Sequence, residues 1–132
     1  MKVLICGDRN YTNKERIDKF ILSLPFDTEI IEGEARGADS IARDCAETRG
    51  LKVHKFPADW GKYFKAAGPI RNSQMLKEGK PDLVIAYHDN IKESKGTKNM
   101  ATISLKAGIP VYLNVEDYLY IELKIVEQYK GE

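Results

Sequence analysis

Five short runs rich in β-branched and other apolar residues recur along the chain, and segments with helical periodicity separate them. The runs are Lys2–Cys6, Thr28–Glu32, Leu51–Phe56, Asp82–Tyr87 and Ile109–Leu113. A continuous apolar run of this length is typical of a strand that is buried on both faces. Strands that alternate with helices form a parallel sheet with helices on both sides. We therefore predict a Rossmann-like α/β domain, a three-layer structure around a five-stranded, mainly parallel sheet.

The segments between these runs carry start and stop signals of helices. Thr12 and Glu15 have the form of a capping box, and Pro25 ends the apolar stripe that follows them. Further helices are predicted after the loop at 33–39, over about 70–78, and from Thr97 as a possible N-cap. The predicted ends of these helices are Gly50, Gly79 and Gly108. The stretch from Pro57 to Pro69 is predicted to be a long loop.

Composition restricts the partners of the chain. It has 132 residues, of which 42% are hydrophobic and 31% charged, and its formal net charge is +1. This balance fits one globular domain with a packed core. A near-neutral chain has no general attraction for nucleic-acid backbones, which usually bind to a basic stripe, so a nucleic-acid partner is not favoured and any anion binding must be local. No apolar run approaches the roughly 20 residues that span a bilayer, and the first residues do not form a signal peptide. We expect a cytoplasmic protein without membrane contact.

The two cysteines, Cys6 and Cys45, lack the spacing of metal ligands. We interpret them as small apolar residues in a reducing compartment, with a disulfide between them as the weaker alternative. His54 and His88 likewise lack partner patterns for a metal or a catalytic triad. The sequence predicts no metal and no other cofactor.

The tail after residue 113 is set apart from the main domain, which we place at residues 1–113. Within residues 114–132, Leu119, Ile121, Leu123 and Ile125 alternate with polar or aromatic residues. Alternation of this kind favours an extra edge strand over a helix. An exposed apolar edge needs covering, so this segment is a candidate subunit contact in a homodimer or higher homo-oligomer.

Glycine, arginine and hydroxyl residues concentrate after the predicted strands. Parallel strands bring these loops to one edge of the sheet, where α/β proteins bind their ligands. The residues of interest are Gly7, Asp8 and Arg9 after the first strand, Gly33, Arg36, Gly37, Ala38 and Asp39 after the second, and Gly96 and Thr97 after the fourth.

The loop "GEARGAD" at 33–39 has two interpretations. Its glycines are explained by a tight turn between strand and helix, or by a phosphate cradle at the helix N-terminus. Arg36 favours the cradle, because a guanidinium suits two phosphate oxygens. Asp39 is expected to be the helix N-cap, with contact to a ribose hydroxyl as the alternative. The spacing matches neither G-x-G-x-x-G nor the NTPase P-loop.

Two further segments carry candidates. Arg71 and Met75 share one face of the predicted 70–78 helix, although an arginine there is by default a surface charge. Asp59 and Trp60 follow the third strand; Trp60 is expected to be a core anchor, with base stacking as the alternative. Asp8 and Arg9 are also open to pairing with each other.

These loops together resemble a known family. The segments "GEARGAD", "FPADW…KAAGPIRNSQM" and "SKGTKNM…AGIPV" occur in the order and spacing of the YspA-like branch of the SLOG superfamily, which also contains the DprA (Smf) and Lonely guy proteins. The resemblance covers residues 2–113. It implies a Rossmann-like fold whose glycine-rich loops bind nucleotides or NAD-derived ligands, in some relatives as sensors in bacterial and phage conflict systems.

The resemblance to the Lonely guy enzymes is incomplete. Those enzymes cleave the N-glycosidic bond of nucleoside monophosphates with an arginine, which Arg71 matches, and a glutamate in P-G-G-x-G-T-x-x-E. Here the second motif lacks Pro-Gly-Gly, and Met100 stands in place of the glutamate. Glycosidic cleavage needs a carboxylate, and the residues alone do not select one. The carboxylate candidates are Asp8, Asp39, Asp59 and Glu93.

The preferred hypothesis is therefore a binding module for a nucleotide or NAD-derived ligand. Phosphate would lie against Gly33, Arg36, Gly37, Ala38, Gly96 and Thr97, the pocket would be lined by Gly7, Asp8, Arg9 and Asp39, and Arg71 and Asn72 would clamp the ligand from the short helix. Asp59, Trp60 and Met75 are candidate base contacts. The alternatives are a Lonely guy-like hydrolase and, with less support, a DprA-like DNA-binding accessory protein.

Overall fold

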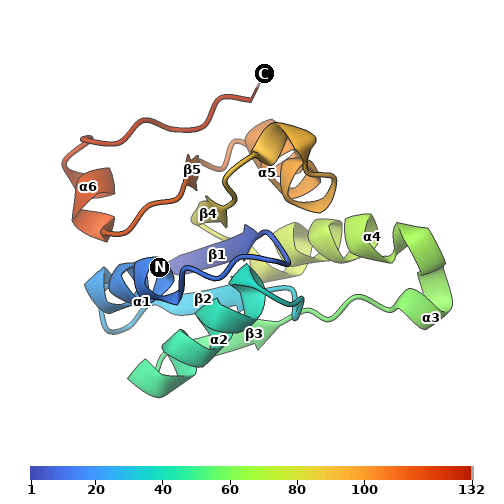
Figure 1. Ribbon diagram of the computed structural model, residues 1–132, viewed down its shortest axis with the longest axis horizontal. Coiled ribbons are helices and arrows are strands. Elements are labelled where there is room, and N and C mark those ends of the chain that lie inside the picture. The colour runs from blue at the N-terminus through green and yellow to red at the C-terminus, as the bar shows by residue number, and fades with distance from the viewer. Residues whose placement is uncertain (132) are drawn as a thin grey trace.

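The computed structural model describes residues 1–131 as one α/β structure (Figure 1). Its strands are β1 (Lys2–Gly7), β2 (Glu29–Glu32), β3 (Lys52–Lys55), β4 (Leu83–Tyr87) and β5 (Val111–Leu113). Its α-helices are α1 (Lys14–Ser23), α2 (Ala38–Arg49), α3 (Trp60–Tyr63), α4 (Ala67–Gln74), α5 (Gly96–Lys106) and α6 (Tyr118–Glu122). Short turns of 3-10 helix at Phe64–Ala66 and Ile91–Glu93, and of π-helix at Met75–Gly79, complete the regular structure.

All five strands are parallel and follow the order β3-β2-β1-β4-β5. Alternate residues of the central strand β1 enter two separate cores: Val3 and Ile5 face one, and Leu4 and Cys6 face the other. Helices α1 and α2 cover the first face, and α5 with the end of the α4 segment covers the second. Each fully buried aliphatic side chain stabilises the fold by about 1.5–3 kcal/mol. The predicted fold class is confirmed.

The helix ends are determined by the residues close to them, and the N-cap of α1 lies one residue after its predicted position. Gly50, directly after α2, and Gly108, one residue further beyond the end of α5, adopt positive φ angles of 86° and 76°, as predicted for helix ends. The N-cap of α1 is Asn13, whose side chain accepts from the Arg16 N–H at 3.1 Å, so the prediction of Thr12 is wrong. Asparagine and threonine are both good caps, and adjacent candidates are decided by how the chain enters the helix.

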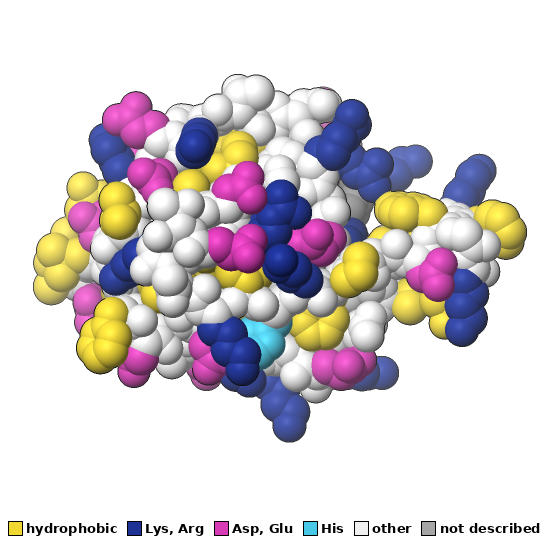
Figure 2. Space-filling model, turned by 90° about the horizontal axis from the view of Figure 1, so that it is seen from below, with side chains coloured by type: hydrophobic (Ala, Val, Ile, Leu, Met, Phe, Trp, Pro, Cys, Tyr) yellow, Lys and Arg dark blue, Asp and Glu magenta, His cyan; other side chains and the backbone are white. Residues whose placement is uncertain are grey.

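The predicted loop before residue 70 contains helical structure. Asp59 caps the short helix α3, and α4 begins at Ala67, three residues earlier than predicted, with Pro69 in its first turn. Proline is tolerated in a first turn because its missing N–H has no partner there in any case. The α3 segment projects from the body of the molecule, and Figure 2 shows hydrophobic side chains on its surface.

The tail forms a helix, so the predicted edge strand is wrong. Asp117 caps α6 by accepting from the Leu119 N–H at 2.9 Å. Tyr118 and Ile121, three residues apart and on one face, pack against the first core, while Leu119 and Leu123 are exposed. A cap and one pair of anchoring side chains therefore outweigh the alternation of apolar residues.

The two cysteines are free and buried, as the preferred interpretation predicted. Cys6 belongs to the core on one side of the sheet, and Cys45 belongs to the core on the other side. A disulfide between them is therefore excluded by the fold.

Gly37 is expected to be required for stability. Its φ is +72°, and a Cβ there would lie 2.2 Å from the Asp8 carbonyl oxygen. At Gly50 φ is +86°, but a Cβ would meet nothing within 4 Å. Gly50→Ala should cost about 1–2 kcal/mol for the left-handed backbone alone, and Gly37→Ala should cost more in the free energy of unfolding measured by urea titration. Equal losses in the two variants would contradict this account.

Candidate functional site

The larger of two adjoining cavities opens at the carboxyl ends of β1 and β4. The strand order reverses between these two strands, which is where open α/β sheets bind ligands. The cavity has a volume of about 510 Å³, in the range of small-molecule sites. Its charged lining comprises the cations Arg9, Lys65, Arg71 and Lys95 and the carboxylates Asp8 and Asp39. The site is therefore locally positive in a chain that is nearly neutral overall.

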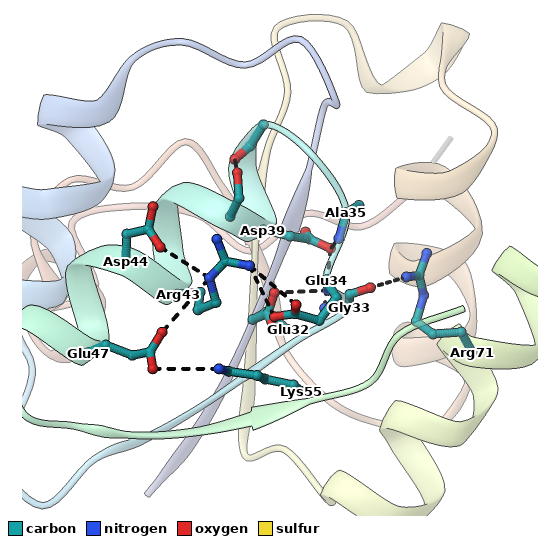
Figure 3. Close-up of polar contacts among 12 residues, drawn as sticks. Glu32, Gly33, Glu34, Ala35, Asp39, Arg43, Asp44, Glu47, Lys55 and Arg71 are labelled. Atoms are coloured by element: carbon teal, nitrogen blue, oxygen red, sulfur yellow. Dashed lines mark hydrogen bonds and ion pairs between the residues drawn. The ribbon is translucent and has the colours of Figure 1, made fainter. Parts of the chain in front are cut away.

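The backbone N–H groups of the 33–35 loop are paired inside the protein (Figure 3). Asp39 Oδ2 accepts from the N–H groups of Gly33 and Ala35 at 3.2 and 3.3 Å, and Glu32 Oε1 accepts from Glu34 at 2.9 Å. The Ala38 N–H at the start of α2 donates to the Asp8 carbonyl at 3.2 Å. Because carboxylates and a carbonyl occupy these donors, the loop offers a ligand its arginine rather than these amides.

Asp39 is not the helix N-cap, so that prediction is wrong. The N-cap position of α2 is Gly37, and Asp39 lies in the first turn with its carboxylate directed back to the loop. The side chain is only 5% exposed and lines the larger cavity. Burial raises the pKa of Asp39 to about 6, against the opposing effects of Arg71 and the two N–H donors.

A pair of carboxyl groups lies beneath the same loop. Glu32 is fully buried, and its Oε2 has no hydrogen-bond partner within residues 1–131. Burial, together with the neighbouring Glu34 side chain, raises the pKa of Glu32 to about 9, so Glu32 is protonated at neutral pH. The Glu34 carboxylate accepts from Arg43 at 3.2 Å (Figure 3). Arg43 therefore compensates the charge of Glu34.

Arg71 reaches from α4 to the loop after β2 and lines both cavities. Its Nη1 donates to the Gly33 carbonyl at 2.5 Å, and its Nε donates to Asn72 Oδ1 at 3.0 Å. A Cβ on residue 33 would lie 2.5 Å from Arg71 Nη1, so this approach requires glycine. Desolvation lowers the pKa of Arg71, and nearby Asp39 counteracts the shift. The guanidinium is held in place before any ligand arrives.

Asn72 connects α4 to the start of α5. Its Nδ2 donates to Asn99 Oδ1 at 2.9 Å and to the Gly96 carbonyl at 3.3 Å. The N-cap position of α5 is Lys95, and the preceding Ser94 Oγ accepts from the N–H groups of Thr97 and Lys98, so Thr97 does not cap this helix. The Thr97 side chain is buried at the wall of the larger cavity.

Trp60 stands at the boundary of both cavities and is not a core residue. It is 47% exposed, lines each cavity and lies under the Arg9 guanidinium, 5.3 Å from the ring centroid. The core-anchor interpretation is therefore wrong. Arg9 stacks on this ring, and Asp8 Oδ1 accepts from the Asn10 N–H at 2.9 Å, so pairing between Asp8 and Arg9 is not observed within residues 1–131.

The smaller cavity has a volume of about 270 Å³ and is also lined by Arg71. Arg9, Ala35, Trp60 and Arg71 line both cavities, so the two adjoin. Arg36 lines only the smaller one, together with Gly33 and Glu34.

Comparison with known proteins assigns the family. The family model of the YspA, cpYpsA-related SLOG family matches residues 1–63. The Gene 61 protein of Mycobacterium phage D29 is 34% identical over 122 residues, covering 83% of this chain and 93% of that protein. The chain belongs to the YspA, cpYpsA-related SLOG family.

The SLOG fold is also found in a solved structure. The X-ray structure of DNA processing protein A (DprA) from Streptococcus pneumoniae superimposes with a TM-score of 0.70 over 94% of this chain, at 16% sequence identity. At that identity the similarity shows the fold alone. The present chain spans 56% of the length of that DprA chain.

The structure places most of the predicted site residues of this SLOG chain around the two cavities. The larger cavity is lined by Gly7, Asp8, Arg9, Asp39, Trp60, Arg71, Asn72, Met75, Gly96 and Thr97. The smaller cavity is lined by Gly33 and Arg36 as well as Arg9, Trp60 and Arg71. Gly37, Ala38, Asp59 and Glu93 line neither cavity. The predicted phosphate-binding residues are thus divided between two spaces.

Several lining residues were not predicted. Asn99, His88 and Lys65 line the larger cavity, and Ala35 lines both. Asn99 lies one turn after Gly96 on α5, so helical spacing from the predicted loop would have found it. Lys65 carries no comparable signal, because only the path of the projecting α3 segment brings it to the cavity.

Residues 1–131 contain no helix that is long and apolar enough to cross a membrane. In the same residues, no group of three or more His, Cys, Asp or Glu side chains is arranged to hold a metal ion.

The buried Glu32 should make stability fall as the pH rises. Because its folded pKa is raised from 4.5 to about 9, the folded state holds a proton that the unfolded state releases between these values. Glu32→Gln keeps the shape without the proton, so the variant should gain stability relative to the wild type between pH 6 and pH 9. Urea unfolding across this range measures the difference, and Glu15→Gln on the exposed face of α1 is the control. An unchanged difference across the range would contradict a protonated Glu32.

Proposed function

We propose that this SLOG chain binds a nucleotide or nucleotide-derived small molecule in the larger cavity, as a sensor or sequestering module. The observation that carries the proposal is the placement of Arg71. This guanidinium lines a 510 Å³ cavity at the point where the strand order reverses, and two hydrogen bonds hold it there. Pre-ordering lowers the entropic cost of binding an anion.

The rest of the lining suits the other parts of a nucleotide. Met75 and Met100 are buried residues that give one part of the cavity an apolar surface, and Trp60 offers an exposed ring at its edge for stacking. Lys65 and Lys95 add positive charge for a phosphate. Asp39 supplies a carboxylate that can accept from a ribose hydroxyl.

A thermal-shift panel tests this proposal. AMP, GMP, NAD, ADP-ribose, cyclic ADP-ribose and cyclic dinucleotides are each added at increasing concentration. A ligand at about 100 times its Kd stabilises the folded state by about 2.7 kcal/mol, which corresponds to a rise in Tm of roughly 5–10 °C for a domain of this size. Arg71→Ala should weaken binding at least about tenfold, the loss expected for a charge-assisted hydrogen bond.

Arg16→Ala is the matched control for this experiment. Arg16 donates to Tyr11 Oη at 3.1 Å and lines neither cavity, so its removal should leave the ligand-induced shift unchanged. The absence of a shift with every compound in the wild type would refute the proposal. An equal loss of binding in both arginine variants would refute the role of Arg71.

A second candidate function is hydrolysis of the N-glycosidic bond of a nucleotide, and Asp39 favours it. Among the four carboxylates considered, Asp39 alone combines burial, a place in the cavity beside Arg71 and a pKa raised to about 6. In this reaction the carboxylate activates water, the hydroxyl joins the sugar carbon, and the base leaves with a proton. Asp8 has its carboxylate engaged with the Asn10 N–H, and Asp59 caps α3.

Chromatography separates the two candidates. A hydrolase should release free base from AMP or GMP over time, and the rate should fall below about pH 6 as Asp39 takes up a proton. Asp39→Asn should reduce the rate by about 10²–10⁴-fold, as for loss of a general base, and should still show a ligand-induced thermal shift. Binding without any release of base identifies the chain as a binding module.

A further inference from the structure

The predicted phosphate-binding residues are divided between the two adjoining cavities, and the charged residues that line the smaller cavity are mostly arginines. Three of its lining residues are arginines, Arg9, Arg36 and Arg71, and its one carboxylate is Glu34. Glu34 is already compensated, because its carboxylate accepts from Arg43. The field in the smaller cavity is therefore set by guanidinium groups without a matching anion.

The three arginines differ in how strongly the protein engages them. Arg71 is held by the Gly33 carbonyl and by Asn72, and Arg9 is stacked on Trp60. The Arg36 side chain is exposed and has no hydrogen-bond or ion-pair partner within residues 1–131. Its five N–H donors are therefore available for a ligand, and their planar arrangement matches two oxygens of a phosphate.

The wall between the cavities is formed by groups that face both. Arg9, Ala35, Trp60 and Arg71 line each of them, so a ligand that fills the larger cavity can continue past Arg71 into the smaller one. The smaller volume, about 270 Å³, has room for a phosphate group. The apolar methionines and Trp60 line the larger cavity, which suits the nucleoside.

We infer that the smaller cavity is a second anion subsite, in which Arg36, Arg9 and Arg71 bind a further phosphate of a ligand whose nucleoside part occupies the larger cavity. The inference rests on the proposed binding function and narrows it. The preferred ligand is a nucleoside diphosphate or a diphosphate-linked compound such as ADP-ribose, and a nucleoside monophosphate fills only part of the site. Arg36 is the residue that discriminates between these classes.

Calorimetric titration with AMP, ADP and ADP-ribose tests the inference. The wild type should bind ADP and ADP-ribose at least about tenfold more tightly than AMP, since a further charged group becomes hydrogen-bonded. Arg36→Ala should remove this preference and leave AMP affinity within about twofold. Arg36→Lys, which keeps the charge without the paired donors, should retain an intermediate preference.

The design distinguishes failure of the inference from failure of the proposed function. If AMP and ADP bind with equal affinity, or if Arg36→Ala weakens both to the same extent, the second subsite is refuted and the binding function stands. If none of the three nucleotides binds but another compound of the thermal-shift panel does, the inference fails and the proposed function stands. If no compound of that panel binds either, the proposed function fails and the inference fails with it. Arg36 is exposed and makes no side-chain contact in residues 1–131, so the variant should fold, as its Tm will verify.

Inorganic pyrophosphate, which carries no nucleobase, tests anion binding in the smaller cavity by itself. In ¹⁵N-resolved NMR spectra of the wild type it should shift the backbone amide signals of Ala35, Arg36 and Ala58, which line this cavity. These shifts should be lost at Ala35 and Ala58 in Arg36→Ala. Shifts confined to the start of α5, or shifts that persist unchanged in the variant, would overturn the assignment.

Discussion

The contact between Arg71 and the Gly33 carbonyl organises the functional face of this SLOG protein. It joins α4 to the loop after β2 across the carboxyl ends of the strands, and its guanidinium lines both cavities there. The contact depends on a glycine at residue 33, because any Cβ would displace the guanidinium. Asn72 extends the same connection to α5, so both sides of the larger cavity are held by one continuous hydrogen-bonded chain.

Two carboxyl groups at this face, those of Asp39 and Glu32, accept hydrogen bonds from the protein's own loop amides. Asp39 accepts hydrogen bonds from the N–H groups of Gly33 and Ala35, and Glu32 accepts one from the N–H group of Glu34. With these acids buried or compensated, the arginines and lysines dominate the potential of the cavities. A chain whose formal charge is only +1 can thereby present a cationic site of the size of a small molecule.

The structural features that were predicted correctly are those that depend on residues close together in the sequence. The apolar runs became the five strands, and Gly50 and Gly108 ended their helices because the left-handed backbone at these positions favours glycine. The errors at Thr12, Asp39 and Thr97 share one cause. Several residues near each helix start could cap it, and the entry path of the chain selected Asn13, Gly37 and Lys95 as the N-cap positions. The tail was misread because its Asp117 cap and its packing on the first core outweighed its alternation.

The sequence by itself determined the fold class, the family resemblance and the edge of the sheet at which the site lies. Each of these follows from patterns within a few residues or from the rule that parallel strands end together. Only the tertiary structure decided how the candidate residues are combined. It buries Asp39, which raises the pKa of that carboxyl group, and it pairs the amides of the 33–35 loop. It also places Trp60 at the boundary of the two cavities and leaves the Arg36 side chain without a partner within residues 1–131. These outcomes depend on distances between residues far apart in the chain, such as Gly33 and Arg71, which burial and packing set and no local pattern encodes.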